Sequence, residues 1–203
     1  MLFCIQLTTH RPEPMRKQYI QANDLLVDSF ELALNILRSP LRPDLLIGLW
    51  RGGTPIAIAV HEALKVVGLP LEHMVVKTAV YRGIDQRNNG VAISGLEPLS
   101  ALNKAPKSIL VVDDVFDSGT TMKAVIEALK AHPASAEATI SVATVWWKPA
   151  RNQTAYTPDY WVHQTDDWLV FPHELEGLST DELAAKPGAE AMAAFLAHQP
   201  GET

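Results

Sequence analysis

The sequence SILVVDDVFDSGTT, residues 108–121, contains a strand, a loop and the start of a helix in one continuous stretch. Residues 109–112 are a run of β-branched and leucine side chains, which is typical of a strand buried on both faces. The strand is expected to end at Asp113. Residues 116–121 are small or hydroxylated around Gly119, and apolar residues then recur at helical spacing. The stretch therefore predicts a loop that leads into a helix N-terminus, where free N–H groups attract an anion.

Three aspartates lie within five positions of this stretch, at Asp113, Asp114 and Asp117. Two adjacent carboxylates would repel a bare phosphate, but they suit sugar hydroxyls and Mg²⁺, a cation that prefers oxygen ligands. The hydroxyls and amides of residues 118–121 suit a phosphate. A ribose with a phosphate on its 5-position fits both halves. The alternative is an ordinary strand, turn and helix without a ligand, which would not explain the three carboxylates.

The motif DDVFDSGTT, residues 113–121, resembles the 5-phosphoribosyl 1-pyrophosphate (PRPP) motif of the type I phosphoribosyltransferases. The resemblance implies an α/β fold, a mostly parallel sheet flanked by helices, with Mg²⁺ as cofactor. It also implies that Asp113 and Asp114 bind the metal and that Asp117 is the general base. The residues implied to bind PRPP are Asp113, Asp114, Phe116, Ser118, Gly119, Thr120 and Thr121.

A second strand, glycine-rich turn and helix surrounds Arg51-Gly52-Gly53. Residues 44–50 predict a buried strand, and Thr54 with Pro55 are a natural N-cap and first helical residue. Alone, such a turn is weak evidence for function. In the type I phosphoribosyltransferases the equivalent loop binds pyrophosphate, so the resemblance assigns Arg51, Gly52 and Gly53 to that group. Relatives carry a non-proline cis peptide before the basic residue, which predicts a cis Trp50–Arg51 bond, with unusual dihedral angles at the two glycines.

A long polar segment, residues 81–107, follows a third predicted strand at 74–80. Loops of this length are usually functional or disordered. The segment lies where the family carries a flexible loop that closes over the substrate. This position makes Tyr81 and Arg82 candidates for contact with pyrophosphate, and a disordered surface insertion is the alternative for each of them.

Two features near the C-terminus bear on the base. Residues 137–147 predict a strand, and Lys148 follows it directly, at a position where a lysine is usually solvated. Residues 167–174, DWLVFPHE, resemble the ending of the 6-oxopurine (hypoxanthine, guanine and xanthine) phosphoribosyltransferases. That resemblance implies that Lys148 donates to the purine O6, that Trp168 stacks on the base and that the Leu169 carbonyl meets the 2-position. Core packing is the alternative for Trp168.

The end of this segment departs from the family pattern. Relatives often have tryptophan where this chain has His173, and we interpret His173 as structural. Glu174 is a candidate ligand for a second Mg²⁺. A small hood that holds Lys148, Trp168 and the residues beyond them is expected to cover the base. The alanine-rich tail, interrupted by Pro187-Gly188, predicts two short helices.

Helical spacing also predicts the buried faces of two earlier helices. Asn23 is expected to cap the first helix. Its apolar face is Leu26, Phe30, Ala33 and Leu37, and that of the helix after Pro55 is Ile56, Val60, Leu64 and Val67.

The chain has 203 residues and a net charge of −6, with 17 Lys and Arg against 23 Asp and Glu. We expect one domain, residues 1–203, with a core at about 19–178 and a helical tail at 179–203. The acidic balance disfavours a nucleic-acid binder, which is normally basic. Because no apolar run reaches the roughly 20 residues of a membrane span and residues 1–7 do not resemble a signal peptide, the expected compartment is the cytoplasm.

The resemblance implies a reaction of purine salvage. Phosphoribose passes from Mg-PRPP to N9 of hypoxanthine, guanine or xanthine, and pyrophosphate and a purine nucleoside monophosphate are released. PRPP and a purine base are the expected partners, and relatives are commonly dimers or tetramers. Two alternatives stay open: a regulator that binds PRPP without turnover, and a phosphoribosyltransferase for a different base.

Overall fold

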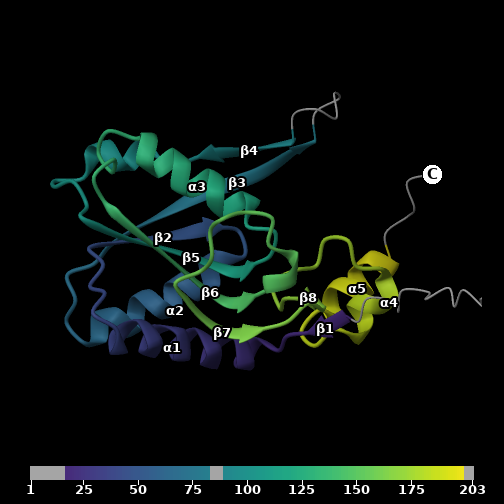
Figure 1. The fold of residues 1–203 in the computed structure, drawn as a ribbon. Coiled ribbons are helices and arrows are strands. Elements are labelled where there is room, and N and C mark those ends of the chain that lie inside the picture. The colour runs from purple at the N-terminus through teal and green to yellow at the C-terminus, as the bar shows by residue number, and fades with distance from the viewer. Residues whose placement is uncertain (1–16, 83–88, 199–203) are drawn as a thin grey trace, which may run out of the picture.

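The computed structural model describes residues 17–82 and 89–198 and is built around a six-stranded sheet (Figure 1). The strand order is β4-β3-β2-β5-β6-β7. The strands are β2 (Leu45–Trp50), β3 (Glu72–Arg82), β4 (Asn89–Ser94), β5 (Ser108–Phe116), β6 (Thr139–Trp147) and β7 (Tyr160–Gln164). Neighbours pair in parallel except β3 with β4, which are antiparallel. The predicted mostly parallel α/β fold is confirmed.

Helices cover both faces of this sheet. In Figure 1, α1 (Ala22–Arg38) and α2 (Gly53–Val66) lie along one face and α3 (Thr120–Ala131) lies along the other. Leu110 and Val112 of β5 pack in the core cluster of α1 and α2, whereas Ile109 and Val111 pack in the cluster of α3. All four are fully buried, which explains the continuous apolar run of this central strand.

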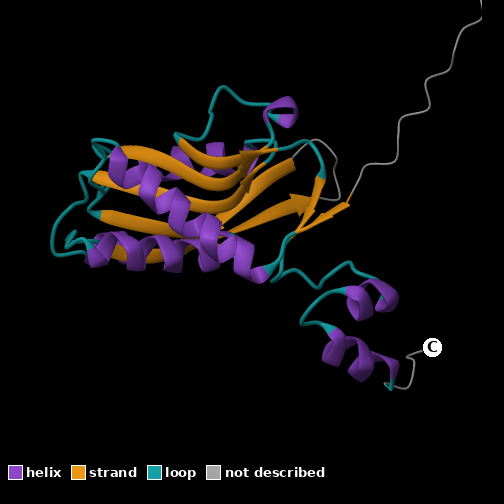
Figure 2. Ribbon diagram, turned by 90° about the horizontal axis from the view of Figure 1, so that it is seen from below, coloured by secondary structure: helices purple, strands orange, loops and turns teal. Residues whose placement is uncertain are grey.

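A smaller unit lies beyond the end of the sheet (Figure 2). In it β1 (Lys17–Tyr19) pairs in parallel with β8 (Trp168–Val170), and α4 (Thr180–Ala185) and α5 (Glu190–Ala197) follow. The two short tail helices are confirmed. The prediction that the hood holds Lys148 is wrong, because this lysine directly follows β6 of the large sheet and begins the 3₁₀ turn η2 (Pro149–Arg151).

Three element boundaries differ from the sequence prediction. Strand β5 continues past Asp113 to Phe116, because β6 is long enough to pair with it up to Trp147. Helix α2 begins at Gly53 and not after Thr54, and α1 begins at Ala22 with Gln21 as its N-cap in place of Asn23. Because β5 extends to Phe116, Asp113 and Asp114 are strand residues.

The predicted buried face of α1 is partly wrong. Leu26 and Phe30 are 47% and 43% exposed. The buried residues are Leu25, Ser29, Leu32, Ala33 and Ile36. Apolar residues occupy both sides of this helix, so spacing alone does not select the face that packs on α2 and the sheet. Val67, predicted to be buried, is 57% exposed because α2 ends before it.

The long polar segment after β3 contains more regular structure than expected. Strand β4 pairs Asn89 with Arg82 and Ser94 with Lys77, and a 3₁₀ helix, η1, spans Glu97–Ala101. The predicted closing loop therefore coincides largely with a β-hairpin and a short helix, and residues 83–88 lie outside the described part of the chain.

No helix within residues 17–82 and 89–198 is both long and apolar enough to cross a membrane.

Candidate active site

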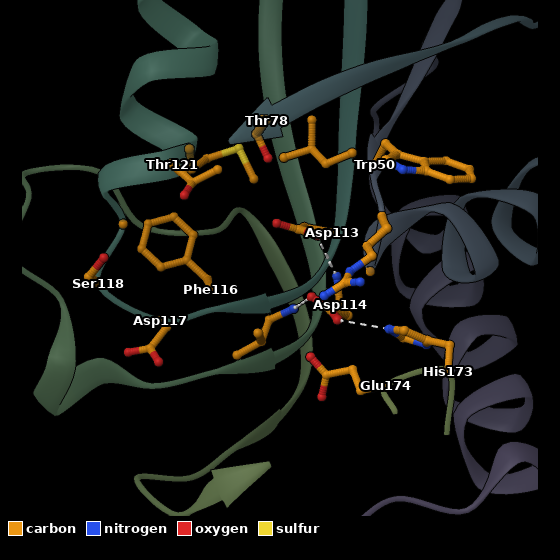
Figure 3. A pocket seen from close by; sticks show the side chains of 16 residues that line it. Trp50, Thr78, Asp113, Asp114, Phe116, Asp117, Ser118, Thr121, His173 and Glu174 are labelled. Atoms are coloured by element: carbon orange, nitrogen blue, oxygen red, sulfur yellow. Dashed lines mark hydrogen bonds and ion pairs between the residues drawn. The ribbon is translucent and has the colours of Figure 1, made fainter. Parts of the chain in front are cut away.

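A cavity of about 300 Å³ opens beside the carboxyl ends of β2 and β5. Figure 3 shows the surrounding side chains, which come from separate segments of the chain. The lining consists of Leu49, Trp50, Arg51, Gly52, Thr78, Asp113, Asp114, Val115, Phe116, Asp117, Ser118, Gly119, Thr121, Met122, His173 and Glu174. The central acidic motif, the basic loop and the segment after β8 therefore share one site.

Asp113 and Asp114 bring two neighbouring carboxylates to this cavity. The Asp114 N–H donates to the Asp113 carboxylate at 3.0 Å, and the Val115 N–H donates to the Asp114 carboxylate at 2.8 Å. Burial and, second to it, the like charge of Asp114 raise the pKa of Asp113 well above its ordinary value. A cation or a hydroxyl donor bound here would relieve the repulsion between the two groups.

Asp113→Asn is expected to stabilise the ligand-free protein at neutral pH. The raised pKa means that the folded state binds a proton where the unfolded chain has released it, so wild-type stability falls as pH rises from 3.8 through the raised pKa. Thermal melting should show a higher Tm for the variant than for the wild type at about pH 8 and equal Tm values at about pH 4. A stability difference of about 1 kcal/mol corresponds to a Tm difference of roughly 2–4 °C. The same difference at both pH values would contradict this reading.

The basic loop follows β2 directly. The Trp50–Arg51 peptide bond is cis, as predicted. Arg51 forms an ion pair with Glu176 at 2.9 Å, and both side chains are more than half exposed. Exposed pairs of this kind contribute little stability, so an incoming anion can replace Glu176 as the partner of Arg51.

The two glycines of the basic loop lie so close to β5 that there is no room for a side chain at either position. The prediction of unusual dihedral angles is wrong, since Gly52 has φ −62° and ψ −36° and neither glycine has positive φ. A Cβ on Gly52 would lie 2.1 Å from a carboxylate oxygen of Asp114, and one on Gly53 would lie 2.4 Å from the Val112 carbonyl oxygen. A Cβ on Gly53 would also lie 3.0 Å from a carboxylate oxygen of Asp113. The loop backbone therefore packs directly against the end of β5.

The turn between β5 and α3 has the features expected of an anion site. Gly119 is the N-cap of α3 with φ +78°, a conformation that favours glycine. The hydroxyls of Ser118 and Thr120 lie 2.8 Å apart. Ser118, Gly119 and Thr121 line the cavity, whereas Thr120 is exposed beside it. The start of α3 thus presents hydroxyl groups and a helix N-terminus to the same cavity.

Asp117 is held between two cations. Arg151 Nε lies 2.6 Å from Asp117 Oδ1, and Lys148 Nζ lies 3.6 Å from Oδ2. Lys148 is only 4% exposed, although a lysine just after a strand is usually solvated. The buried ammonium of Lys148 is thus paired with a carboxylate that lines the cavity, although Lys148 does not line it. Sequence reasoning missed Arg151, whose position three residues after Lys148 in a short 3₁₀ turn is a weak pattern.

The segment after β8 closes one side of the cavity. His173 Nε2 lies 3.4 Å from Asp114 Oδ2, and the two side chains point toward each other in Figure 3. The His173 ring also stacks on Phe171, with centroids 5.6 Å apart. The Glu174 carboxylate accepts from the Phe171 N–H at 3.0 Å. His173, interpreted as structural, therefore also faces the acidic pair.

The carboxylates of Asp113 and Asp114 are of the type that fits a magnesium ion. No group of three or more His, Cys, Asp or Glu that could cage a metal occurs in the described ranges. Mg²⁺ is usually held by one or two carboxylates together with substrate phosphates and water. Asp113 and Asp114 supply two such groups at the cavity wall. Glu174 as the ligand of a second ion stays a prediction.

Several predicted residues lie outside the lining that the described residues give this cavity. They are Gly53, Thr120, Lys148, Trp168 and Leu169. Leu169 is buried in the core, but Trp168 is 48% exposed, which argues against core packing for its ring. Tyr81 and Arg82 end β3, and their side chains lie outside what the structure describes. Their roles all stay predictions.

Sequence reasoning also missed residues of the lining that belong to regular elements, among them Thr78 and Met122. Thr78 lies in the middle of β3, and Met122 belongs to the buried face of α3. Both positions follow ordinary strand or helix patterns, so only the packing of these elements reveals that they reach the cavity.

The chain is similar to a known protein family and to several solved structures. The model of the phosphoribosyl transferase domain matches residues 16–179. A purine phosphoribosyltransferase from Pyrococcus horikoshii OT3 is 30% identical, with a TM-score of 0.64 over 80% of this chain and 97% of that one.

Two more distant structures share the fold. A hypothetical protein from Neisseria gonorrhoeae with bound ppGpp is 22% identical, with a TM-score of 0.68 over 88% of this chain and 98% of its own. A xanthine-guanine-hypoxanthine phosphoribosyltransferase from Helicobacter pylori is 19% identical, with a TM-score of 0.65 over 88% and 99%.

Proposed function

The chain belongs to the phosphoribosyl transferase domain family, and from this premise we propose that it transfers 5-phosphoribose from Mg-PRPP to N9 of a 6-oxopurine. The acceptor is hypoxanthine, guanine or xanthine, and the products are pyrophosphate and a purine nucleoside monophosphate. One observation carries the proposal: the acidic motif, the hydroxyl-rich turn and the basic loop, each expected to bind a different part of PRPP, line one cavity. The similarity to the Pyrococcus purine enzyme supports a purine as acceptor.

The arrangement suits displacement at C1′ of the ribose. Positive charge develops on the sugar and negative charge on the departing pyrophosphate, so fixed charges contribute most to catalysis. Asp113 and Asp114 would hold the ribose hydroxyls and face the cationic ring. Arg51 would exchange Glu176 for the pyrophosphate. Bound Mg²⁺ supplies additional positive charge for the leaving group, and Asp113 and Asp114 are the residues that would hold it.

The purine would approach from the side of Asp117 and Lys148. Asp117 can accept the proton of the purine N7 as N9 attacks C1′ of the ribose. Lys148 lies 3.6 Å from Asp117, so its ammonium can reach an oxygen acceptor placed next to that carboxylate. The exposed ring of Trp168 is available to stack on the base.

Lys148→Met and Trp168→Ala are each expected to impair use of the purine far more than binding of PRPP. A hydrogen bond from a charged donor contributes about 1.5–3 kcal/mol, which predicts a loss of roughly ten- to a hundredfold for Lys148→Met. Calorimetry with PRPP and with base measures the two sites separately. Lys130→Met removes an exposed ammonium of α3 and is the charge-matched control. Normal base binding in both variants would contradict the assignment of a 6-oxopurine as the acceptor and would leave the acceptor base unidentified.

A panel of bases with Mg-PRPP tests the function itself. The protein is incubated with hypoxanthine, guanine, xanthine, adenine, orotate or uracil, and base absorbance and pyrophosphate release are followed. Pyrophosphate release with one or more of the three 6-oxopurines is the expected result. PRPP binding without release under any base would identify a regulator, and release with adenine, orotate or uracil alone would identify a different acceptor. The expected dimer or tetramer stays a prediction.

A further inference from the structure

Lys186 is a buried lysine in the C-terminal tail, beyond the residues that match the family model. It is 4% exposed and caps the end of α4. Its ammonium donates to the Phe171 carbonyl at 2.6 Å. Burial lowers the pKa of Lys186, and the nearby Glu174 carboxylate opposes that shift. A charged group of the tail therefore reaches the segment that closes the cavity.

The segment that Lys186 contacts is a tight turn from Phe171 to Glu174. The Glu174 N–H donates to the Phe171 carbonyl at 3.0 Å, and the Phe171 N–H donates to the Glu174 carboxylate at 3.0 Å. The Phe171 carbonyl thus accepts from both Glu174 and Lys186. Within this turn His173 faces Asp114, and both His173 and Glu174 line the cavity.

We propose that Lys186 is a positioning residue for the PRPP side of the active site: by fixing the Phe171 carbonyl, it holds the turn that places His173 against Asp114 and Glu174 at the cavity. This inference deepens the proposed function and rests on it. Lys186 acts through the turn and does not itself line the cavity.

The base side of the same segment is held differently. Trp168 and Leu169 lie in β8, which pairs with Lys17 and Gln18 of β1. The Ile20 N–H extends this pairing to the Val170 carbonyl at 3.0 Å. Strand pairing therefore positions the residues proposed to hold the purine, whereas Lys186 positions the turn that follows. Loss of Lys186 should therefore weaken the binding of PRPP and leave the use of the purine unchanged.

A purely structural role would be an unusual use of this side chain. An ammonium loses its hydration on burial, and a carbonyl oxygen compensates for this less than a carboxylate would. An unbranched apolar side chain such as methionine fills similar space without that penalty. If Lys186 served packing alone, Lys186→Met would leave stability and substrate binding unchanged or improved.

The test uses Lys186→Met and Lys186→Gln, the latter ending one bond short of the ammonium. Calorimetry with Mg-PRPP in the absence of base is expected to show about 10–100-fold weaker binding in both variants, the range seen when a group that orients a ligand-binding residue is removed. Steady-state kinetics should show KM for PRPP raised and KM for the purine unchanged. If Lys186→Met does not fold, Lys186→Gln carries the comparison.

Lys17→Met is the matched control. Lys17 bonds Glu182 of α4, so this variant removes another ammonium that ties the tail to the hood without touching the turn. It should keep wild-type affinity for Mg-PRPP. Unchanged PRPP affinity in the Lys186 variants, equal losses for PRPP and base, or an equal loss in Lys17→Met would each overturn the inference. A wild-type protein that binds Mg-PRPP but turns over no purine would overturn the proposed function alone, because the ratio of PRPP affinities still tests Lys186.

Discussion

Asp117→Asn is expected to lower kcat by about 10²–10⁴-fold, the usual effect of losing a general acid or base. The asparagine keeps one oxygen, which can accept from Arg151, now 2.6 Å from Asp117 Oδ1, while its amide nitrogen takes the place of Oδ2, which lies 3.6 Å from Lys148. It therefore removes proton acceptance while keeping the shape of the side chain and the closer contact with Arg151. Single-turnover kinetics with hypoxanthine and calorimetric titration with PRPP measure the chemical step and the binding step separately.

The control for this variant is Asp166→Asn, which removes a carboxylate from an exposed position. It should keep the wild-type rate. Weakened PRPP binding at unchanged turnover in Asp117→Asn would show instead that Asp117 binds the substrate and takes no part in proton transfer.

Gly53→Ala is expected to reduce kcat/KM for PRPP by about 10²-fold or more, since displacement of a reacting group by about 1 Å has an effect of that size. The added Cβ would lie 2.4 Å from the Val112 carbonyl oxygen and 2.8 Å from the Asp113 Cα. Both neighbours are backbone atoms of β5, so the side chain cannot be accommodated by a rotamer change. The basic loop must move away from the acidic pair.

Gly90→Ala is the matched control for this substitution. Gly90 lies in β4, and a Cβ there meets no atom within 4 Å. Circular dichroism checks that both variants keep their fold, and PRPP titration then reports the position of the loop. Wild-type PRPP use in a folded Gly53→Ala protein would falsify the assignment of this loop to the substrate.

Residues close together in sequence accounted for the local structural features that were predicted correctly. The buried apolar run 109–112 is a property of a short segment, and the cis bond before Arg51 followed from the resemblance of a short segment to a known family. A parallel sheet then brings the carboxyl ends of neighbouring strands to one edge, so β2 and β5 had to deliver their loops to a common place. The meeting of these two loops at one edge of the sheet was therefore accessible without coordinates.

Contacts between distant segments account for what was missed. Spacing in α1 allows two apolar faces, and packing on α2 selects the one with Leu32 and Ile36. The neighbours of Asp117 come from the turn after β6. Each of these outcomes depends on which side chains meet across the fold, which residue spacing does not encode.

The sequence by itself determined the α/β architecture, the acidic motif with its glycine turn and the loop that carries Arg51, because strand, turn and helix preferences act over a few residues. Only the tertiary structure decided why Gly52 and Gly53 must be glycine, since the reason is the closeness of β5 and not their dihedral angles. It also decided that the buried Lys186 of the tail donates to the Phe171 carbonyl in the turn beside the cavity. These features arise from van der Waals contact and charge burial between segments that are far apart in the chain.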